Sequence, residues 1–351
     1  MFKLHQSQIL TISWLLILIG GDFLLLGRQQ EPTQATAGSS ADLLINGNFE
    51  TGAFQWFYPN HYVAANWNRW WIHGTPAPEF TDIGYGRLPY EGDHAQVYHS
   101  WNAYTAGIFQ QITGLTPCRP YELRFYAKTN SPGNTTPNTK IGLDPTGSLL
   151  TTDGAVKNGL PAETVWSAEQ TALYTWEELA VQAEPVGASL TAILYSAPRS
   201  SEYVPYDTFW DAGELVPVSY HDGRLPAPSA EATGFINNTN IVTGSQSITI
   251  TWQTDAGAST QVWYNILTPS PQISPTTTLT HTAYLPLIAT GERDYEYSSG
   301  INYIQATIHQ VIIDALQPDD EVRFIILARH FAGACLTERS EQFTARTKAM
   351  P

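Results

Sequence analysis

Apolar and polar residues alternate in short runs along most of this chain, and clusters of glycine, proline and asparagine separate the runs. A period of two is typical of strands with one buried face. We expect residues 43–45 to form an apolar strand that runs into a turn at 46–50. The runs predict further strands at 107–112, 121–128, 179–182, 189–195 and 208–216. Short strands at regular spacing indicate an all-β sandwich or barrel.

The same alternation resumes in the last third of the chain. Strands are predicted at 247–253, 261–267, 310–315, 321–328 and 340–348. Residues 268–282 are rich in proline, serine and threonine, which predicts a long inserted loop. We therefore expect two all-β domains, at 43–218 and 231–351, joined by a linker at 219–230 that contains two prolines.

The N-terminal segment predicts export. An apolar run at 9–21 follows Lys3 and His5, and it is shorter than the roughly 20 residues of a membrane span. The sequence Ala35-Thr36-Ala37 has the small residues that signal peptidase accepts. We expect a signal peptide at 1–37, a short linker at 38–42 and an extracellular or cell-surface protein. An uncleaved membrane anchor is the alternative.

Composition narrows the range of partners. Charged residues make up 14% of the chain, aromatic residues 12%, and the net charge is −15. No run of lysine and arginine is present, which argues against nucleic acid and anionic lipid as partners. The two cysteines, Cys118 and Cys335, fall in different predicted domains. Their spacing predicts neither a disulfide framework nor a metal site, and a bridge between the domains is left open as the less favoured alternative.

Several motifs of the first domain occur together in one known class of protein. They are the opening Asn46-Gly47-Asn48-Phe49-Glu50, the run Ala106-Gly107-Ile108-Phe109-Gln110, the turn Gly114-Leu115-Thr116-Pro117 and the closing Phe209-Trp210-Asp211-Ala212-Gly213. Residues 43–218 thereby resemble the galactose-binding-like jelly roll of carbohydrate-binding modules. A closer likeness, to a group of such jelly rolls in bacterial exported proteins, is marked by Pro78-Glu79-Phe80, by residues 141–147 and by Val165-Trp166-Ser167. The resemblance implies a jelly-roll β-sandwich and a sugar ligand.

The second domain resembles a fibronectin type III domain. The shared features are Trp252 in its strand, Leu316 and Pro318 in the turn, and Phe343 near the end. The chain departs from that family at Val322, where the family usually has a tyrosine. The expected fold is therefore all-β, a jelly-roll β-sandwich followed by a smaller immunoglobulin/fibronectin III-like β-sandwich.

Two aromatic clusters are candidate sugar-binding surfaces, because aromatic rings stack on the apolar faces of sugars. In the first cluster, at 54–74, Trp70 and Trp71 are adjacent in a predicted strand, so at most one of them faces the core. Trp56 and Trp67 are expected in the core. The second cluster, at 98–104, is a predicted loop. The candidate carbohydrate-binding residues are Trp70, Trp71, Glu79, Trp101 and Tyr104.

Calcium is the expected ion, on the strength of the resemblance. Jelly rolls of this class often hold a structural Ca²⁺ between the opening turn and the last strand, and carboxylate oxygens suit this ion. The matching residues here are Glu50 and Asp211, with Asp207 as a possible third ligand. The alternative for Glu50 is a hydrogen-bonded residue at a strand edge.

No catalytic motif is found. The sequence has no nucleophile elbow, zinc-binding His-Glu-x-x-His or phosphate-binding loop. A glycosidase pair could be drawn from Glu79, Asp82, Glu91 and Asp93, but the spacing of carboxylates in space does not follow from sequence. We expect a secreted, non-catalytic and monomeric protein that binds a polysaccharide or cell-surface glycan. The alternatives are a structural or adhesive protein that binds other cell-envelope proteins and, less favoured, a glycoside hydrolase.

Overall fold

The structure, a computed structural model, describes residues 42–57, 61–72, 75–83, 88–150, 155–156, 159–220, 223–228, 234–267 and 295–349. The predicted signal peptide at 1–37, most of the linker at 38–42 and the predicted loop at 268–282 lie outside the described residues. In the described part of the chain, no helix is long and apolar enough to cross a membrane. The named elements there are all β-strands, as the alternating pattern predicts.

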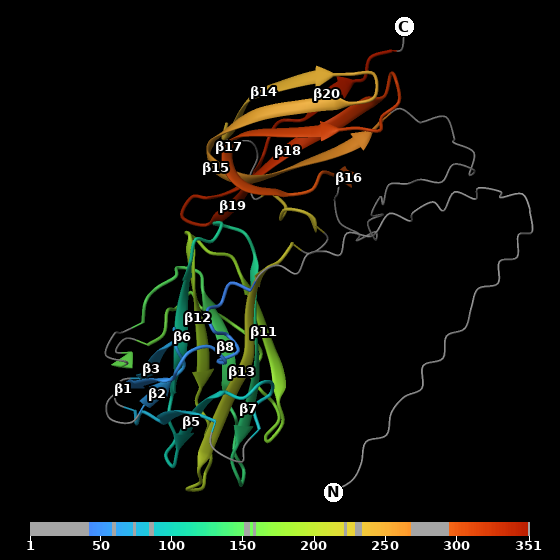
Figure 1. The fold of residues 1–351 in the computed structure, drawn as a ribbon. Helices are drawn as coiled ribbons and strands as arrows, with labels where there is room; N and C mark the ends of the chain where they lie inside the picture. The colour runs from blue at the N-terminus through green and yellow to red at the C-terminus, as the bar shows by residue number, and fades with distance from the viewer. Residues whose placement is uncertain are drawn as a thin grey trace, which may run out of the picture. The chain divides into compact units, whose positions relative to one another are not determined.

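The first sandwich has two packed sheets and a separate hairpin (Figure 1). The six-stranded sheet has the order β10 (Val165–Trp166), β8 (Thr139–Asp144), β12 (Ser189–Ser196), β6 (Ala106–Thr113), β3 (Asn68–Ile72) and β9 (Ala155–Val156). The five-stranded sheet has the order β11 (Glu177–Ala183), β7 (Tyr121–Asn130), β13 (Tyr206–Pro217), β5 (Gln96–Ser100) and β4 (Glu79–Asp82). Most neighbouring strands are distant in sequence and antiparallel, as expected for a jelly roll.

Large aromatic rings fill the space between the two sheets. Phe49, Trp67, Phe125 and Trp210 are buried there, and the ring centroids of Trp67 and Phe125 lie 5.7 Å apart at nearly a right angle. Such edge-to-face pairs are favourable in cores. The prediction that Trp67 is a core residue is confirmed. Gly213 is required here, because a Cβ at this position would collide with the Phe125 ring.

A second, smaller apolar cluster covers the outer face of the six-stranded sheet. Trp70, Phe109 and Ile193 project outward from β3, β6 and β12, and they pack against Leu150 and against Val156 of the edge strand β9. The Trp70 ring is fully buried as a result. This outer cluster was not predicted from the sequence pattern.

The opening segment differs from its prediction. Residues 43–45 form bends rather than a strand, although the Leu43 amide still donates to the Leu215 carbonyl at 2.9 Å. Asn46 and Phe49 have φ angles of 58° and 62°. Two residues in the left-handed region so close together end any extended pairing, so the segment folds as a tight turn beside β13.

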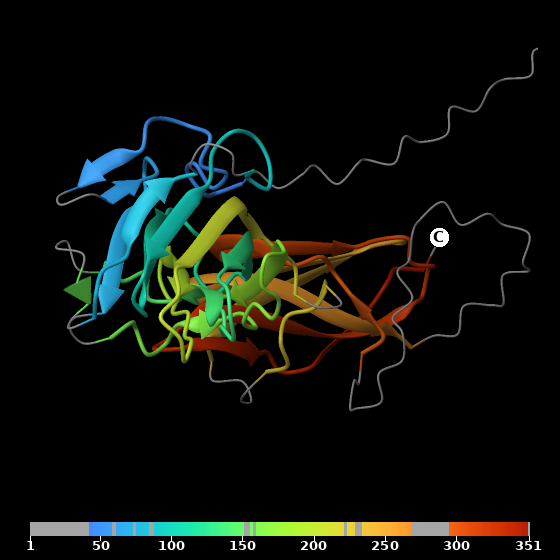
Figure 2. The same ribbon diagram turned by 90° about the horizontal axis from the view of Figure 1, so that it is seen from below.

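A two-stranded hairpin of β1 (Gln55–Phe57) and β2 (His61–Val63) lies against the edge of the first sandwich (Figure 2). Trp56 and Tyr62 are directly opposite each other in the hairpin register. They point to solvent, and 55% of Trp56 is exposed. The prediction that Trp56 belongs to the core is therefore wrong, because its strand packs on the sandwich with the other face, through Phe57 and His61.

The second sandwich contains the remaining strands. These are β14 (Ile236–Thr243), β15 (Ile248–Ile266), β16 (Tyr297–Ser298), β17 (Asn302–Ile313), β18 (Glu321–Phe331), β19 (Cys335–Arg339) and β20 (Phe343–Arg346). The predicted strands at 247–253 and 261–267 are one continuous strand, β15. Its first half pairs with β14 and β17 and its second half with β18, so one strand serves both layers. Trp252 and Val322 are buried in the core between them.

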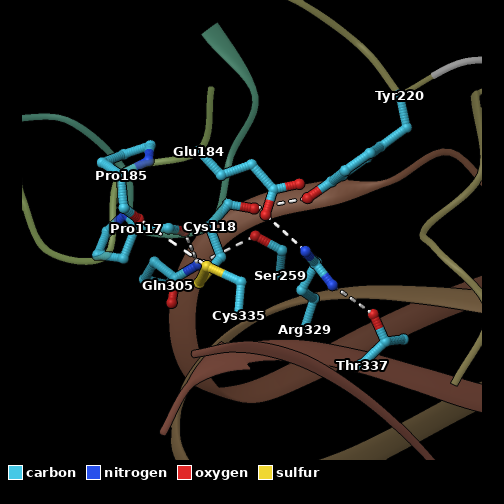
Figure 3. Close-up of a disulfide and its surroundings, with 10 residues drawn as sticks. All are labelled: Pro117, Cys118, Glu184, Pro185, Tyr220, Ser259, Gln305, Arg329, Cys335 and Thr337. Carbon is cyan, nitrogen blue, oxygen red and sulfur yellow. Dashed lines mark hydrogen bonds and ion pairs between the residues drawn. A yellow bond between two sulfur atoms is a disulfide. The ribbon is translucent and has the colours of Figure 1, made fainter. Parts of the chain in front are cut away.

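A disulfide joins the two sandwiches (Figure 3). Cys118 lies before β7 and Cys335 begins β19, and their Cα atoms are 5.5 Å apart. The less favoured alternative of the sequence analysis is thus the observed one. A disulfide of this kind indicates an extracytoplasmic location, because the cytosol keeps thiols reduced.

Polar contacts surround this disulfide. Arg329 on β18 donates to the Glu184 carboxylate at 2.5 Å and to the Thr337 hydroxyl at 2.8 Å (Figure 3). The Tyr220 hydroxyl donates to the Cys118 carbonyl at 2.6 Å, and burial raises the pKa of Tyr220. The bridge is therefore supported by a hydrogen-bonded junction that involves both sandwiches.

Candidate functional site

Four polar residues form a row across the outer face of the five-stranded sheet. Glu79 on β4 is directly opposite His99 on β5, His99 is opposite Asp207 on β13, and Asp207 is opposite Asn130 on β7. Residues opposite each other in adjacent strands share one face of the sheet. Their strand neighbours, such as Tyr98, are buried on the other face. The row therefore points away from the core.

The centre of this row is fixed by one hydrogen bond. His99 Nδ1 lies 2.6 Å from Asp207 Oδ1, and both side chains are partly buried. A carboxylate only accepts, so Nδ1 carries the proton and Nε2 is the second hydrogen-bonding atom of the ring. The His99 ring also meets the Trp101 ring edge-on at a centroid distance of 6.4 Å. These contacts hold the imidazole in one orientation.

Two exposed aromatic rings stand beside the centre of the row, next to His99. Trp101 follows β5 and Tyr203 lies in the loop before β13, and their rings stack at 5.8 Å with an interplanar angle of 25°. Half of Trp101 and 75% of Tyr203 are exposed to solvent. Local turns present both rings, because the Ser100 and Ser200 hydroxyls accept from the amides of Asn102 and Glu202.

This arrangement has the chemistry of a sugar-binding surface. A stacked Trp101–Tyr203 pair offers a flat apolar platform, and Glu79, His99 and Asp207 place hydrogen-bonding groups next to it. Sugars combine an apolar ring face with a rim of hydroxyls, so they need both kinds of group in one place. The structure brings together Glu79 and Trp101 from the predicted sugar-binding set and adds Asp207 from the predicted calcium set.

The prediction of Tyr104 as a sugar-binding residue is wrong. Its ring is fully buried, and its hydroxyl lies 3.2 Å from Ser196 Oγ and 3.0 Å from Thr208 Oγ1. Burial raises the pKa of Tyr104 to about 12. Tyr104 is the last residue of the 98–104 segment, and its side chain enters the core just before β6 begins.

The adjacent tryptophans of β3 face opposite sides, as predicted. Trp70 is buried under Leu150 and Val156, so the prediction of Trp70 as a sugar-binding residue is wrong. Trp71 is half-buried; its ring meets His61 edge-on at 5.9 Å, and the Arg69 guanidinium lies over it at 5.6 Å. A sugar-binding role for Trp71 stays a prediction.

Sequence reasoning missed two members of the site. His99 was part of a predicted loop, whereas Gln96–Ser100 is strand β5 and gives His99 its outward direction. Tyr203 lies in a short loop, 202–205, that carries no periodic signal. The alternation of buried Tyr98 with partly exposed His99 was the usable signal for the first of them, and nothing in the local sequence indicated that Tyr203 and Trp101 would meet.

The residues expected to bind calcium do not fit that ion. Glu50 Oε1 accepts from the amides of Asp93 and His94 at 2.9 and 2.8 Å. Asp211 Oδ2 accepts from the amides of Tyr90 and Glu91, and its Oδ1 accepts from the Ala212 amide. Both carboxylates thus face N–H donors, whereas Ca²⁺ takes six to eight oxygen ligands.

Asp207 does not complete a calcium site either. It lies four residues before Asp211 on β13, about 13 Å along the strand, and it is bonded to His99. Among the described residues, no group of three or more His, Cys, Asp or Glu side chains could hold a metal ion. The prediction of Asp207 as a third ligand is wrong because the strand carries it to the other end of the sheet.

Two of the carboxylates considered for glycosidase chemistry, Glu79 and Asp82, do not converge on each other. Glu79 faces outward opposite His99, whereas Asp82 is opposite the buried Gln96 and contacts His94 Nδ1 at 2.7 Å. Glycosidases need two carboxyl groups facing one bond from opposite sides. Glu79 and Asp82 do not have that arrangement, because they project to different sides of β4.

No protein-family model and no curated protein matches this sequence. Among solved structures, the chain is similar to TmCBM61 in complex with beta-1,4-galactotriose (16% identity over 51% of this chain and 100% of that chain, TM-score 0.33). It is also similar to the xylan-binding domain from CBM 22, with 13% identity over 51% of this chain and 97% of that chain and a TM-score of 0.32. A third similar structure is that of the chicken CNTN1 FN1–FN3 domains, with 9% identity over 70% of this chain and 78% of that chain and a TM-score of 0.24. Likenesses at these values carry no argument about function.

Proposed function

We propose that this is an exported, non-catalytic carbohydrate-binding protein that docks on a neutral polysaccharide. The observation that carries the proposal is the stacked, exposed Trp101–Tyr203 pair beside the Glu79–His99–Asp207 row. The predicted signal peptide at 1–37 and the disulfide between Cys118 and Cys335 support export. Cleavage of the signal peptide belongs to the proposal.

The charge of the site supports a neutral ligand. Glu79 and Asp207 are carboxylates, and the chain as a whole carries a net charge of −15. An anionic polymer such as a polyuronate would be repelled, whereas hydroxyl groups can donate to these carboxylates. Binding is therefore expected to be insensitive to salt, because stacking and neutral hydrogen bonds are not screened as ion pairs are.

Affinity electrophoresis across a panel of neutral polysaccharides tests the proposal. The wild-type protein should be retarded by at least one polymer, and Trp101→Ala and Tyr203→Ala should each lose the retardation while remaining folded. Trp56→Ala is the matched control, because Trp56 is exposed to 55% but lies on the hairpin. Unretarded wild-type protein in every lane would overturn the proposal, as would a loss of binding in Trp56→Ala but not in Trp101→Ala.

A second candidate function, adhesion to another protein, is favoured by one surface. Ile304, Ile308 and Ile312 on β17 of the second sandwich are each more than half exposed, and exposed apolar residues in a group mark interaction sites. Under this alternative, Ile308→Lys would abolish binding to a purified envelope protein, and excess oligosaccharide would leave that binding unchanged. Under the carbohydrate-binding proposal, Ile308→Lys leaves glycan retardation unchanged.

A further inference from the structure

A cavity of about 590 Å³ opens on the first sandwich, away from the Trp101–Tyr203 pair. The opening turn contributes Asn46 and Asn48, the loop before β5 contributes Tyr90, and β7 contributes Arg124 and Tyr126. Ligand sites for small molecules usually have volumes of about 300–1,000 Å³ and combine aromatic walls with a few polar groups. This cavity falls within that range of volumes, and its lining is mostly polar with two tyrosine rings.

One wall of the cavity is an aromatic stack. Tyr90 lies parallel to Tyr126, with 3.7 Å between ring centroids and an interplanar angle of 12°. Tyr90 also meets the edge of Trp176 at 5.9 Å, and 43% of Tyr90 remains exposed. An exposed ring backed by a second ring is the kind of platform that binds the apolar face of a sugar.

The loop that carries Tyr90 is held by the carboxylate oxygens of Asp211, which is buried, and Glu50. The amides of Tyr90 and Glu91 donate to Asp211 Oδ2 at 2.8 and 3.1 Å. Further along the loop, the amides of Asp93 and His94 donate to Glu50. Hydrogen bonds to charged acceptors are among the stronger ones, so the Tyr90 ring is positioned before any ligand arrives. A site organised in advance loses less entropy on binding.

The polar wall excludes anionic ligands. Asp42, Glu91, Glu178 and Glu214 line the cavity, and Arg124 is the guanidinium among them, at 3.4 Å from Glu214 and 3.9 Å from Glu178. Four carboxylates to one cation give the cavity a negative potential. Uncharged hydroxyl groups can donate to these oxygens and accept from Arg124.

The cavity and the Trp101–Tyr203 pair belong to the same face of the same sheet. Asn130, in the row beside Trp101, and Arg124, in the cavity, both point outward from β7, six residues or about 20 Å apart. Lys128 lies between them, over the rings of Trp176 and Phe209 at 4.5 and 4.8 Å. Aromatic side chains therefore recur along this face from one site to the other.

We propose that this cavity is a second saccharide subsite, so that the protein binds a linear, uncharged glycan chain lying along the strands of the five-stranded sheet. The inference rests on the proposed function and adds the ligand's length, direction and lack of charge. An oligosaccharide long enough to span about 20 Å contacts both Trp101 and Tyr90, whereas a disaccharide contacts one of them. Affinity therefore rises with chain length through the two linked contacts.

Calorimetric titration with β-1,4-linked galacto-, xylo- and gluco-oligosaccharides from disaccharide to octasaccharide tests this inference. In the wild type, affinity should rise by about tenfold or more between the short and the long members of the series that binds. Tyr90→Ala should keep the affinity for the short members and lose the gain with length. Tyr297→Ala is the matched control, because Tyr297 is a similarly exposed tyrosine stacked on Tyr264 in the second sandwich.

The outcomes separate the two proposals. Wild-type binding that does not change with length, or a Tyr90→Ala profile identical to the wild-type profile, would overturn the second subsite and leave the proposed function intact. No binding of any oligosaccharide at any length would overturn both. Binding of oligogalacturonates that depends on Tyr90 would overturn the assignment of an uncharged ligand.

Discussion

The outer faces of the two jelly-roll sheets carry aromatic residues in opposite environments. On the six-stranded sheet, Trp70 is buried beneath Leu150 and Val156. On the five-stranded sheet, Trp101 stands half exposed beside the polar row, where it meets the edge of His99 and stacks on another exposed ring, Tyr203. The residue type is the same, and the apolar neighbours that surround Trp70 make the difference.

This contrast shows that an aromatic cluster in a sequence does not by itself indicate a binding surface. The 54–74 cluster contributes Trp67 to the main core and Trp70 to the covered face. It places Trp56 in solvent on the hairpin, at a position without the row of hydrogen-bonding groups that accompanies Trp101. A platform needs both an exposed ring and polar neighbours.

Removing a ring from the covered face should have the largest effect on stability. Trp70→Ala should lower the free energy of unfolding by about 3–5 kcal/mol, because it leaves a cavity in a dry cluster. Trp101→Ala should change it by about 0.5 kcal/mol or less, because its ring is half in water. Urea denaturation of both variants measures the two values. Equal losses in the two variants would show that the faces do not differ as described.

The two sandwiches are joined by a disulfide, with polar contacts around it. The double variant Cys118→Ser/Cys335→Ser should lose about 2–4 kcal/mol of stability, because the bridge closes a very long loop. Calorimetry should then show the two sandwiches unfolding separately. As a control, dithiothreitol should destabilise the wild type and leave the variant unchanged. A single unshifted transition in the double variant would contradict this expectation.

Asp211 on β13 should make the stability of the folded protein depend on pH. Burial raises the pKa of its carboxyl from 3.8 to about 6 in the folded protein. Between pH 4 and pH 6, the folded protein keeps a proton that the unfolded chain has lost, so the stability contributed by this group falls as the pH rises. Asp211→Asn removes the dependence, and the stability of the wild type relative to the variant should decrease on the order of 1–3 kcal/mol over this range.

Chemical denaturation at pH 4, 5 and 6 measures this difference. His61→Gln serves as a control of opposite sign, because burial and Arg69 lower the pKa of His61 to about 4. The unfolded chain then binds the extra proton, so stability contributed by His61 rises with pH. A difference between wild type and Asp211→Asn that is constant or increases with pH would contradict the burial of that carboxyl.

The strands were largely predictable from sequence, because a period of two follows directly from one buried face. Strands β6, β7, β11, β12 and β13 fall where alternation predicts them. The predicted strand boundaries were wrong where tertiary contacts, rather than local periodicity, determine the backbone conformation. The long strand β15 looked like two strands because it passes from one layer to the other, and Asn46 and Phe49 turn the opening segment away from an extended conformation.

The candidate site was predictable only in part. Trp101 and Glu79 were identified by residue type. Their place in one site depends on two strand pairings, of β4 with β5 and of β5 with β13. The second pairing joins segments more than 100 residues apart in the sequence. Tyr104 looked equivalent to Trp101 because both follow His99 closely, yet one enters the core and the other faces water. The surroundings of the expected calcium ligands were hidden for a similar reason, since backbone amides of the Tyr90 loop donate to Glu50 Oε1 and Asp211 Oδ2 across long sequence separations.

The most direct test of the account is an NMR titration of the tryptophan indole N–H signals with a neutral oligosaccharide that retards the protein. The account predicts that the Trp101 signal shifts with saturation, while the signals of Trp56 on the hairpin and of the buried Trp70 and Trp210 stay in place. A saturable shift of the Trp56 or Trp71 signal with an unchanged Trp101 signal would contradict it, because the binding surface would then lie on the other edge of the jelly roll.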